Sequence, residues 1–194
     1  MKITLPTNLV LLATLMSACA TTPAAPAADG SDLNGTWKTA CGNKSITTIE
    51  YAGLSLKGTY TAYADDACAT PVAVNTWSGH STITGAGADG ATKIDVHFDS
   101  FRATALTEEQ ATKWSGWGYC EKTDWAANAE VDVMGKQCQG FAVPQGGVNL
   151  DLYKVSGTTL LFGKGSKITA EPHEADRPAA LNAGWAFQKA GGAS

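Results

Sequence analysis

The chain has 194 residues, of which 44% are hydrophobic and 16% are charged, and its formal net charge is −4. This composition is typical of one folded domain with a short appendage. It argues against a disordered chain, which would have fewer apolar residues and a larger net charge, and against a nucleic-acid-binding protein, which would need a basic face.

The N-terminus has the pattern of a secretory signal peptide. Lys2 gives a positive start, and an apolar run over Leu9–Met16 follows. This run is far shorter than the ~20 apolar residues that span a bilayer. The ending Met16-Ser17-Ala18-Cys19 resembles the lipobox of bacterial lipoproteins, which implies cleavage after residue 18 and a lipid on Cys19. Because Ala20 is not Asp, the resemblance implies the outer membrane of the cell envelope. The alternative is ordinary signal cleavage with a bystander cysteine.

The segment after the expected cleavage site looks like a tether. Residues 19–34 are rich in Ala, Pro and small polar residues and have no hydrophobic period, as in flexible linkers. The remaining residues, 35–190, are expected to form the folded domain. The N-terminal lipid would attach this domain to its partner, the membrane, and durable attachment needs more than one acyl chain.

Four cysteines remain in the domain, and an even number in an exported protein indicates two disulfides. They are Cys41, Cys68, Cys120 and Cys138. A hairpin turning around Ala52-Gly53 would bring Cys41 and Cys68 to the same end, which leaves Cys120 for Cys138. The second pair is harder to form, because a straight strand over Trp125–Val133 would span about 30 Å. Zinc is the alternative, but no C-x-x-C spacing and no nearby His support it.

Apolar and polar residues alternate along most of the domain, which is typical of half-buried β-strands. One strand is expected to open at Gly35, and the others cover residues 45–51, 54–63, 72–84 (one long or two short), 91–98, 125–133, 148–155, 158–163 and 183–189. A single helix is expected to begin after Thr107, with Gln110 at the capping-box position, and to run to about Trp114. Many short strands at even spacing predict an all-β sandwich or barrel.

A resemblance favours the barrel. The first strand opens with Gly35-Thr36-Trp37, which resembles the G-x-W signature of lipocalins, whose Trp closes one end of an eight-stranded barrel. The order of later features resembles uncharacterised bacterial lipoproteins with lipocalin-like barrels, and is similar to the barrel domain of secreted Wnt antagonists. These features include Cys41, Tyr63 to Cys68, Trp77-Ser78-Gly79-His80, Tyr119-Cys120, Gly135-Lys136-Gln137-Cys138, Asp151-Leu152-Tyr153-Lys154 and Arg177-Pro178. The expected fold is therefore an antiparallel, eight- to nine-stranded, lipocalin-like barrel with one short helix.

The same resemblance implies a contact between two particular residues. In lipocalins a late Arg packs over the signature Trp. The chain has two Arg, and Arg177 just before the last strand matches better than Arg102. We therefore expect Arg177 to lie over the Trp37 ring as a cation–π pair. The alternative is that Arg177 is a solvated loop residue.

Motifs for catalysis or metal binding are weak. The segment Gly85–Gly90 matches G-x-G-x-x-G, but a strand follows it where a dinucleotide site needs a helix, so we interpret it as a turn. No two His have metal-ligand spacing, and the loop with His173, Glu174 and Asp176 is only a weak metal candidate. No nucleophile elbow, zinc-protease or P-loop motif occurs. We expect no enzyme, no metal and no cofactor.

Aromatic residues are the remaining candidates for a site. An eight-stranded barrel is near the size at which side chains either fill the interior or leave room for one ligand. The main hypothesis is a module that binds a small hydrophobic ligand against Tyr60, Trp77, Phe98 and Trp125. The alternative is a filled barrel that acts as an envelope protein-interaction or inhibitor module. A cavity of ~300 Å³ or more would favour the first hypothesis.

Overall fold

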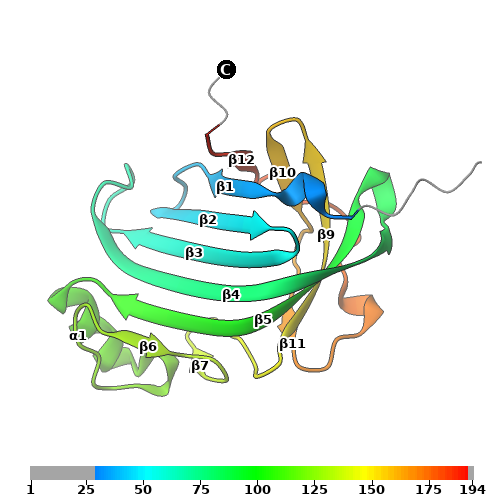
Figure 1. The fold of residues 1–194 in the computed structure, drawn as a ribbon. Coiled ribbons are helices and arrows are strands. Elements are labelled where there is room, and N and C mark those ends of the chain that lie inside the picture. The colour runs from blue at the N-terminus through cyan, green and yellow to red at the C-terminus, as the bar shows by residue number, and fades with distance from the viewer. Residues whose placement is uncertain (1–28, 192–194) are drawn as a thin grey trace, which may run out of the picture.

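The protein is described from a computed structural model, which covers residues 29–191, so the expected signal peptide and Cys19 lie outside the described residues. Eight antiparallel strands close into a barrel, which is one of the two folds that the alternating pattern predicted and the one that the G-x-W resemblance favoured (Figure 1). In order around the barrel they are β1 (Gly35–Thr39), β2 (Ser45–Ala52), β3 (Ser55–Tyr63), β4 (Pro71–Ala86), β5 (Thr92–Ala105), β9 (Val148–Ser156), β10 (Thr159–Phe162) and β12 (Phe187–Lys189). Within the described range, no helix has the length and hydrophobicity to cross a bilayer.

Smaller elements decorate the barrel. Strands β6 (Glu130–Asp132) and β11 (Ile168–Thr169) pair with β5 and β9, and β7 (Gln137–Cys138) forms a separate hairpin with β8 (Phe141–Ala142). Helix α1 (Glu108–Trp117) begins where predicted, because the Thr107 hydroxyl accepts a hydrogen bond from the Gln110 amide at 3.1 Å. It ends three residues later than predicted, at Trp117, and Gly118 is its C-cap. The 3₁₀ turns are η1 (Ser31–Leu33), η2 (Ala88–Gly90), η3 (Tyr119–Glu121) and η4 (Glu174–Asp176).

Strands β4 and β5 are long and extend beyond one end of the barrel. They pair from Ala86 and Thr92 at one end to Ala73 and Ala105 at the other. Helix α1 and the irregular chain that follows it pack against the extended part and bury a second hydrophobic cluster there (Figure 1). We call this end of the barrel, beside α1, the open end. It is built partly from chain without regular structure.

Two predicted strands are shorter than expected, for physical reasons that alternation does not reveal. Of residues 125–133 only β6 is a strand, because Trp125 turns into the second cluster and Asn128 adopts a left-handed φ of 61°. Of residues 183–189 only β12 is a strand. The Asn182 side chain accepts from the Gly184 amide at 3.2 Å, which makes a local turn before the strand.

The other end of the barrel is closed by residues that precede β1. Leu33 is fully buried, and Trp37, also fully buried, donates from its indole nitrogen to the Leu33 carbonyl at 2.6 Å. The Tyr153 hydroxyl donates to Asp32 Oδ1 at 3.1 Å. The predicted tether is therefore too long at its C-terminal boundary, because η1 packs as part of the domain. A single Leu forms no hydrophobic period, so the sequence pattern did not reveal that Leu33 closes this end of the barrel.

Both predicted disulfides are present and both lie at the open end. Cys41–Cys68 joins the loop after β1 to the loop before β4, with the Cα atoms 6.0 Å apart. Cys120–Cys138 joins η3 to β7, with the Cα atoms 3.9 Å apart. The expected difficulty with the second pair disappears, because the chain between Lys122 and Ala129 is not a straight strand.

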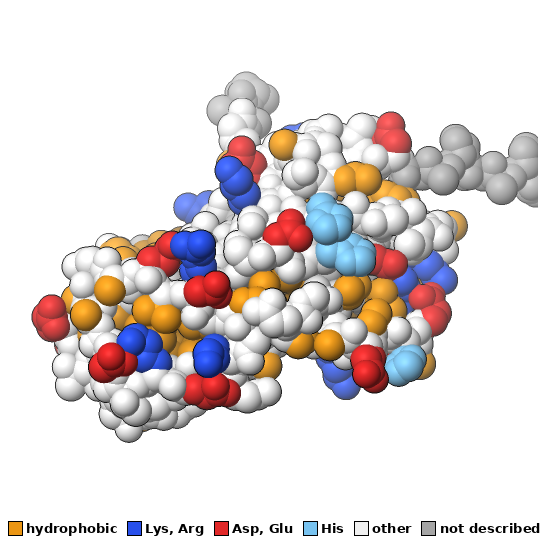
Figure 2. All heavy atoms as spheres, turned by 60° about the horizontal axis from the view of Figure 1, so that its bottom comes forward, with side chains coloured by type: hydrophobic (Ala, Val, Ile, Leu, Met, Phe, Trp, Pro, Cys, Tyr) orange, Lys and Arg blue, Asp and Glu red, His pale blue; other side chains and the backbone are white. Residues whose placement is uncertain are grey.

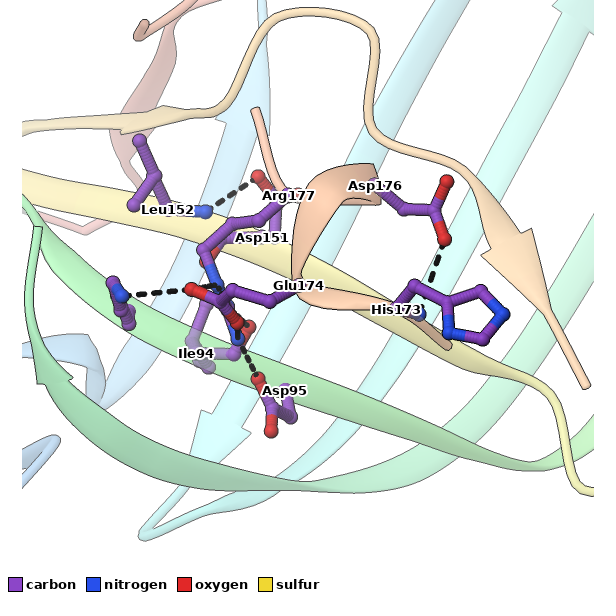
Figure 3. A network of polar contacts seen from close by, with 9 residues as sticks. Ile94, Asp95, Asp151, Leu152, His173, Glu174, Asp176 and Arg177 are labelled. Atoms are coloured by element: carbon purple, nitrogen blue, oxygen red, sulfur yellow. Dashed lines mark hydrogen bonds and ion pairs between the residues drawn. The ribbon is translucent and has the colours of Figure 1, made fainter. Parts of the chain in front are cut away.

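The prediction that Arg177 lies over Trp37 is corrected by the structure. The cation above the Trp37 ring is the Lys189 ammonium, 5.1 Å from the ring centroid. Arg177 instead lies on the outer side of the seam where β5 pairs with β9 (Figure 3). A guanidinium offers five hydrogen-bond donors in a plane, and this seam provides several acceptors within reach of one side chain.

Arg177 joins four acceptors at the seam. It donates to the carbonyl oxygens of Ile94 at 3.1 Å and Asp151 at 2.7 Å, one from each strand. It also pairs with Asp95 at 2.7 Å and with Glu174 at 3.1 Å, and its side chain is only 6% exposed. Neighbouring Arg177 and Lys93 hold the pKa of Glu174 well below its usual range, at about 2. The side chain thus fastens the loop that contains η4 across the closing strand pair.

We predict that Arg177→Met lowers the free energy of unfolding by about 3 kcal/mol, because it leaves Asp95 and two carbonyl oxygens without a shared donor. The matched control is Arg102→Met at the chain's other Arg. Arg102 pairs with Glu130 on the surface, where both side chains are about half exposed, so its loss should cost less than about 1 kcal/mol. Chemical denaturation measures both values, and equal effects would contradict the role of Arg177.

Candidate ligand-binding cavity

The interior of the barrel is hollow. A cavity of about 610 Å³ extends from the closed end to the aromatic residues beside α1. This volume lies within the ~300–1,000 Å³ of small-molecule sites. The lining is mainly aromatic and aliphatic, and it consists of Thr47, Ile49, Tyr51, Leu56, Tyr60, Asn75, Trp77, Val96, Phe98, Phe101, Tyr119, Phe141, Asn149, Asp151, Phe162, Ser166, Ile168 and Trp185.

One glycine makes room for the largest ring in the wall. Gly58 on β3 lies opposite Trp77 on β4, and a methyl group at residue 58 would overlap the Trp77 indole. The indole therefore packs against the backbone of β3. It also stacks on Phe101, with ring centroids 5.9 Å apart and planes 9° from parallel. The two rings form a flat apolar surface on one side of the cavity.

The cavity opens between aromatic side chains. Tyr60 and Trp185 both line it, and they are 37% and 44% exposed. The Trp185 ring also contacts Phe187 of β12, with centroids 5.0 Å apart. Aromatic groups that are half exposed at an opening can contact both the ligand and water, and they offer large contact area with few rotatable bonds. We take Tyr60 and Trp185 as the mouth of the cavity.

The structure places three of the four predicted ligand-binding residues in the wall: Tyr60, Trp77 and Phe98. Trp125 does not line the cavity. Its ring is 6% exposed and packs edge-on against Trp114 at 4.7 Å, and its indole nitrogen donates to the Tyr119 carbonyl at 3.0 Å. Trp125 supports the cavity only from behind Tyr119. Whether the three wall residues bind a ligand stays a prediction.

Asp151 is an acidic residue of the wall that the sequence pattern did not reveal as a site residue. It is 4% exposed, and its Oδ1 accepts from the amides of Leu152 at 2.7 Å and Gly163 at 2.8 Å. Its Oδ2 accepts from Asn149 Nδ2 at 3.3 Å. Burial raises the pKa of Asp151 to about 6, although these hydrogen bonds act in the opposite direction. The carboxylate is thus mostly ionised at neutral pH but costs free energy there.

Alternation hid Asp151 because β9 is buried on both faces. Val148, Leu150 and Leu152 are all buried, yet they lie on the outer side of the strand. Asn149 and Asp151 pair with Val96 and Ile94 of β5 and point inward with them. A rule that assigns apolar residues to the barrel interior would therefore place Asn149 and Asp151 on the outside. The signal available in the sequence is that Asn149 and Asp151 alternate with the apolar Val148, Leu150 and Leu152.

The three histidines do not form a site with other ligands. His80 and His97 face each other across β4 and β5 on the outside of the barrel, and their rings stack with centroids 4.9 Å apart (Figure 2). His80 is exposed and lies 3.4 Å from Asp99. Among residues 29–191 there is no group of three or more His, Cys, Asp or Glu that could hold a metal.

Comparisons of the sequence with models of known protein families and with curated proteins find no match. The cavity is therefore the main structural indication of function.

We predict that Asp151 makes stability fall as pH rises from about 4 to about 6. The folded pKa lies above the ordinary value of 3.8, so the folded state binds more protons than the unfolded state in this range. Asp151→Asn keeps an acceptor for the two amides and removes the charge. Between about pH 4 and pH 6, the free energy of unfolding of Asp151→Asn should therefore rise by about 2–3 kcal/mol relative to that of the wild type.

The measurement is urea denaturation of both proteins at a series of pH values. The control is Asp99→Asn, which removes an equal charge from a side chain that is 58% exposed on the outer surface. A difference curve for Asp151→Asn that matches the control curve would contradict this account of Asp151.

Proposed function

We propose that the protein is an exported, lipid-anchored protein of the cell envelope that binds a small hydrophobic ligand inside a lipocalin-like barrel. The observation that carries the binding role is the cavity of about 610 Å³, with aromatic walls and an exposed mouth at Tyr60 and Trp185. Burial of an apolar ligand there would gain roughly 25 cal/mol for each Å² of apolar surface removed from water.

The cavity also weighs against the other two functions. An interaction or inhibitor module was expected to have a filled barrel, and this interior is hollow. An enzyme needs several polar groups that converge on one reacting atom. In the described part of the cavity wall the ionised group is the lone carboxylate of Asp151, which is held by two backbone amides. We therefore propose binding without catalysis.

Two features support export and anchoring. Two disulfides are typical of an oxidising compartment outside the cytoplasm. The described chain begins at the closed end of the barrel, next to η1, whereas the mouth lies among the segments of the opposite end. A lipid on Cys19 would therefore attach the barrel by its closed end and leave the mouth accessible.

The anchor is tested by acylation. We predict that the full chain, expressed in a Gram-negative host with radiolabelled palmitate, takes up label and sediments with the outer membrane. Cys19→Ser should abolish both, because only a thiol at this place can accept the lipid. The conservative change Thr21→Ser, two residues later, should alter neither. Unlabelled wild-type protein, or label that persists in Cys19→Ser, would refute the anchor and leave the binding role to its own test.

The binding role is tested by filling the cavity. Thr47 and Thr48 are neighbours on β2, and only Thr47 lines the lumen. We predict that Thr47→Phe weakens binding of the fluorescent probe N-phenyl-1-naphthylamine by about tenfold or more, equivalent to roughly 1.4 kcal/mol. Thr48→Phe should bind like the wild type, because the same ring is added to the outside. Circular dichroism confirms that both variants fold. Equal binding by both, or no binding by the wild type, would exclude the lumen as the site.

A further inference from the structure

The described wall of the cavity carries negative charge and no positive charge. Among the described residues that line the lumen, none is Lys, Arg or His, and one is acidic. That residue is Asp151, which projects from the middle of β9 toward the interior. A ligand group placed beside it meets a negative charge in a region of low dielectric, where charge–charge interactions are stronger than in water.

Hydrogen-bond acceptors near Asp151 are also incompletely used. Oδ1 of Asp151 accepts from two backbone amides, Oδ2 accepts one long bond of 3.3 Å from Asn149, and the Ser166 hydroxyl is a further donor to the carboxylate. The Asn149 amide is oriented by that bond, because Nδ2 must face the carboxylate. Its Oδ1 is buried and has no partner in the described structure. A buried acceptor without a donor is costly, and a ligand that donates a hydrogen bond would relieve that cost.

Arg177, on the outer side of the seam, does not neutralise the Asp151 carboxylate. Arg177 touches Asp151 only through the backbone carbonyl, on the outer side of the wall. Its other donors bind the carbonyl of Ile94 and the carboxylates of Asp95 and Glu174. Its charge is therefore already balanced by two acids outside the lumen. The hydroxyls of Tyr51 and Ser166 are further polar groups near the carboxylate, and both are neutral.

We propose that the lumen selects amphiphiles whose polar end donates hydrogen bonds and carries no negative charge, which means long-chain alcohols and amines and not fatty-acid anions. This inference rests on the proposed ligand-binding function. The hydrocarbon chain packs against the flat surface of Trp77 and Phe101, and the hydroxyl or ammonium group binds at Asp151 and Asn149. A carboxylate in the same place would face a second carboxylate with no cation between them.

The experiment compares three ligands that share one chain length: 1-dodecanol, dodecylamine and laurate. Each displaces N-phenyl-1-naphthylamine from the wild-type protein at about pH 8, where laurate is ionised and the Asp151 carboxylate is charged. We expect dodecanol and dodecylamine to compete at least about tenfold better than laurate, a gap of roughly 1.4 kcal/mol or more. Concentrations stay below the micelle threshold of laurate and dodecylamine and below the solubility limit of dodecanol.

Two variants assign the selectivity to Asp151. Asp151→Asn should bind laurate more tightly and dodecylamine more weakly than the wild type, which narrows the gap between them. Asp99→Asn removes the same charge from the outer surface and should leave all three affinities unchanged. A shift of equal size in both variants would mean that net charge, and not the lumen, controls the preference, and would overturn the proposal.

The outcomes separate this inference from the binding role. If laurate competes as well as dodecanol, the selectivity is wrong and the lumen still binds amphiphiles. If neither the probe nor any of the three ligands binds, the proposed function itself fails. If dodecanol and dodecylamine bind, laurate is excluded, and Asp151→Asn relaxes the exclusion, the inference is supported.

Discussion

The pairing of β5 with β9 is the constraint on which the rest of the structure depends. Without it, the first five strands would form an open curved sheet, and the residues on its inner face would be exposed to water. The seam is short compared with the pairing of β4 and β5, and it is reinforced from outside by Arg177, which contacts one carbonyl on each strand. Closure at this place creates an interior and positions Asp151 in its wall. The same seam thus determines the shape of the cavity and places the Asp151 carboxylate in its wall.

Much of the architecture could be predicted from the sequence, because it depends on local patterns. The period-two alternation identified most of the strands and an all-β sandwich or barrel, and the G-x-W resemblance favoured the barrel. Thr107 marked the beginning of α1, and hairpin geometry selected the pairing of Cys41 with Cys68. These features require only information from neighbouring residues. The same locality explains the failures at Leu33 and Arg177, whose partners are set by how the chain returns on itself.

The candidate site was harder to predict than the fold. Tyr60, Trp77 and Phe98 could be placed in the lumen, because they occupy inward positions on strands with clear alternation. Trp125 could not be placed, because it lies in irregular chain where the period has no meaning. Asp151 was missed because loops cover the outer face of β9, so the apolar face of the strand points outward. Hydrophobicity indicates that a residue is buried, but the apolar residues of β9 are buried under loops outside the barrel and not in its interior.

The two ends of the barrel are held together by different kinds of bond. Backbone pairing and the packing of Leu33 on Trp37 maintain the closed end, whereas both disulfides lie among the irregular segments of the open end. Covalent cross-links are thus concentrated where the regular hydrogen-bond ladder is absent. Loss of those cross-links in a reducing compartment would leave the strands paired while the rim lost its fixed outline. The outline of the entrance therefore depends in part on the two disulfides, whereas the strands carry most of the residues that line the cavity.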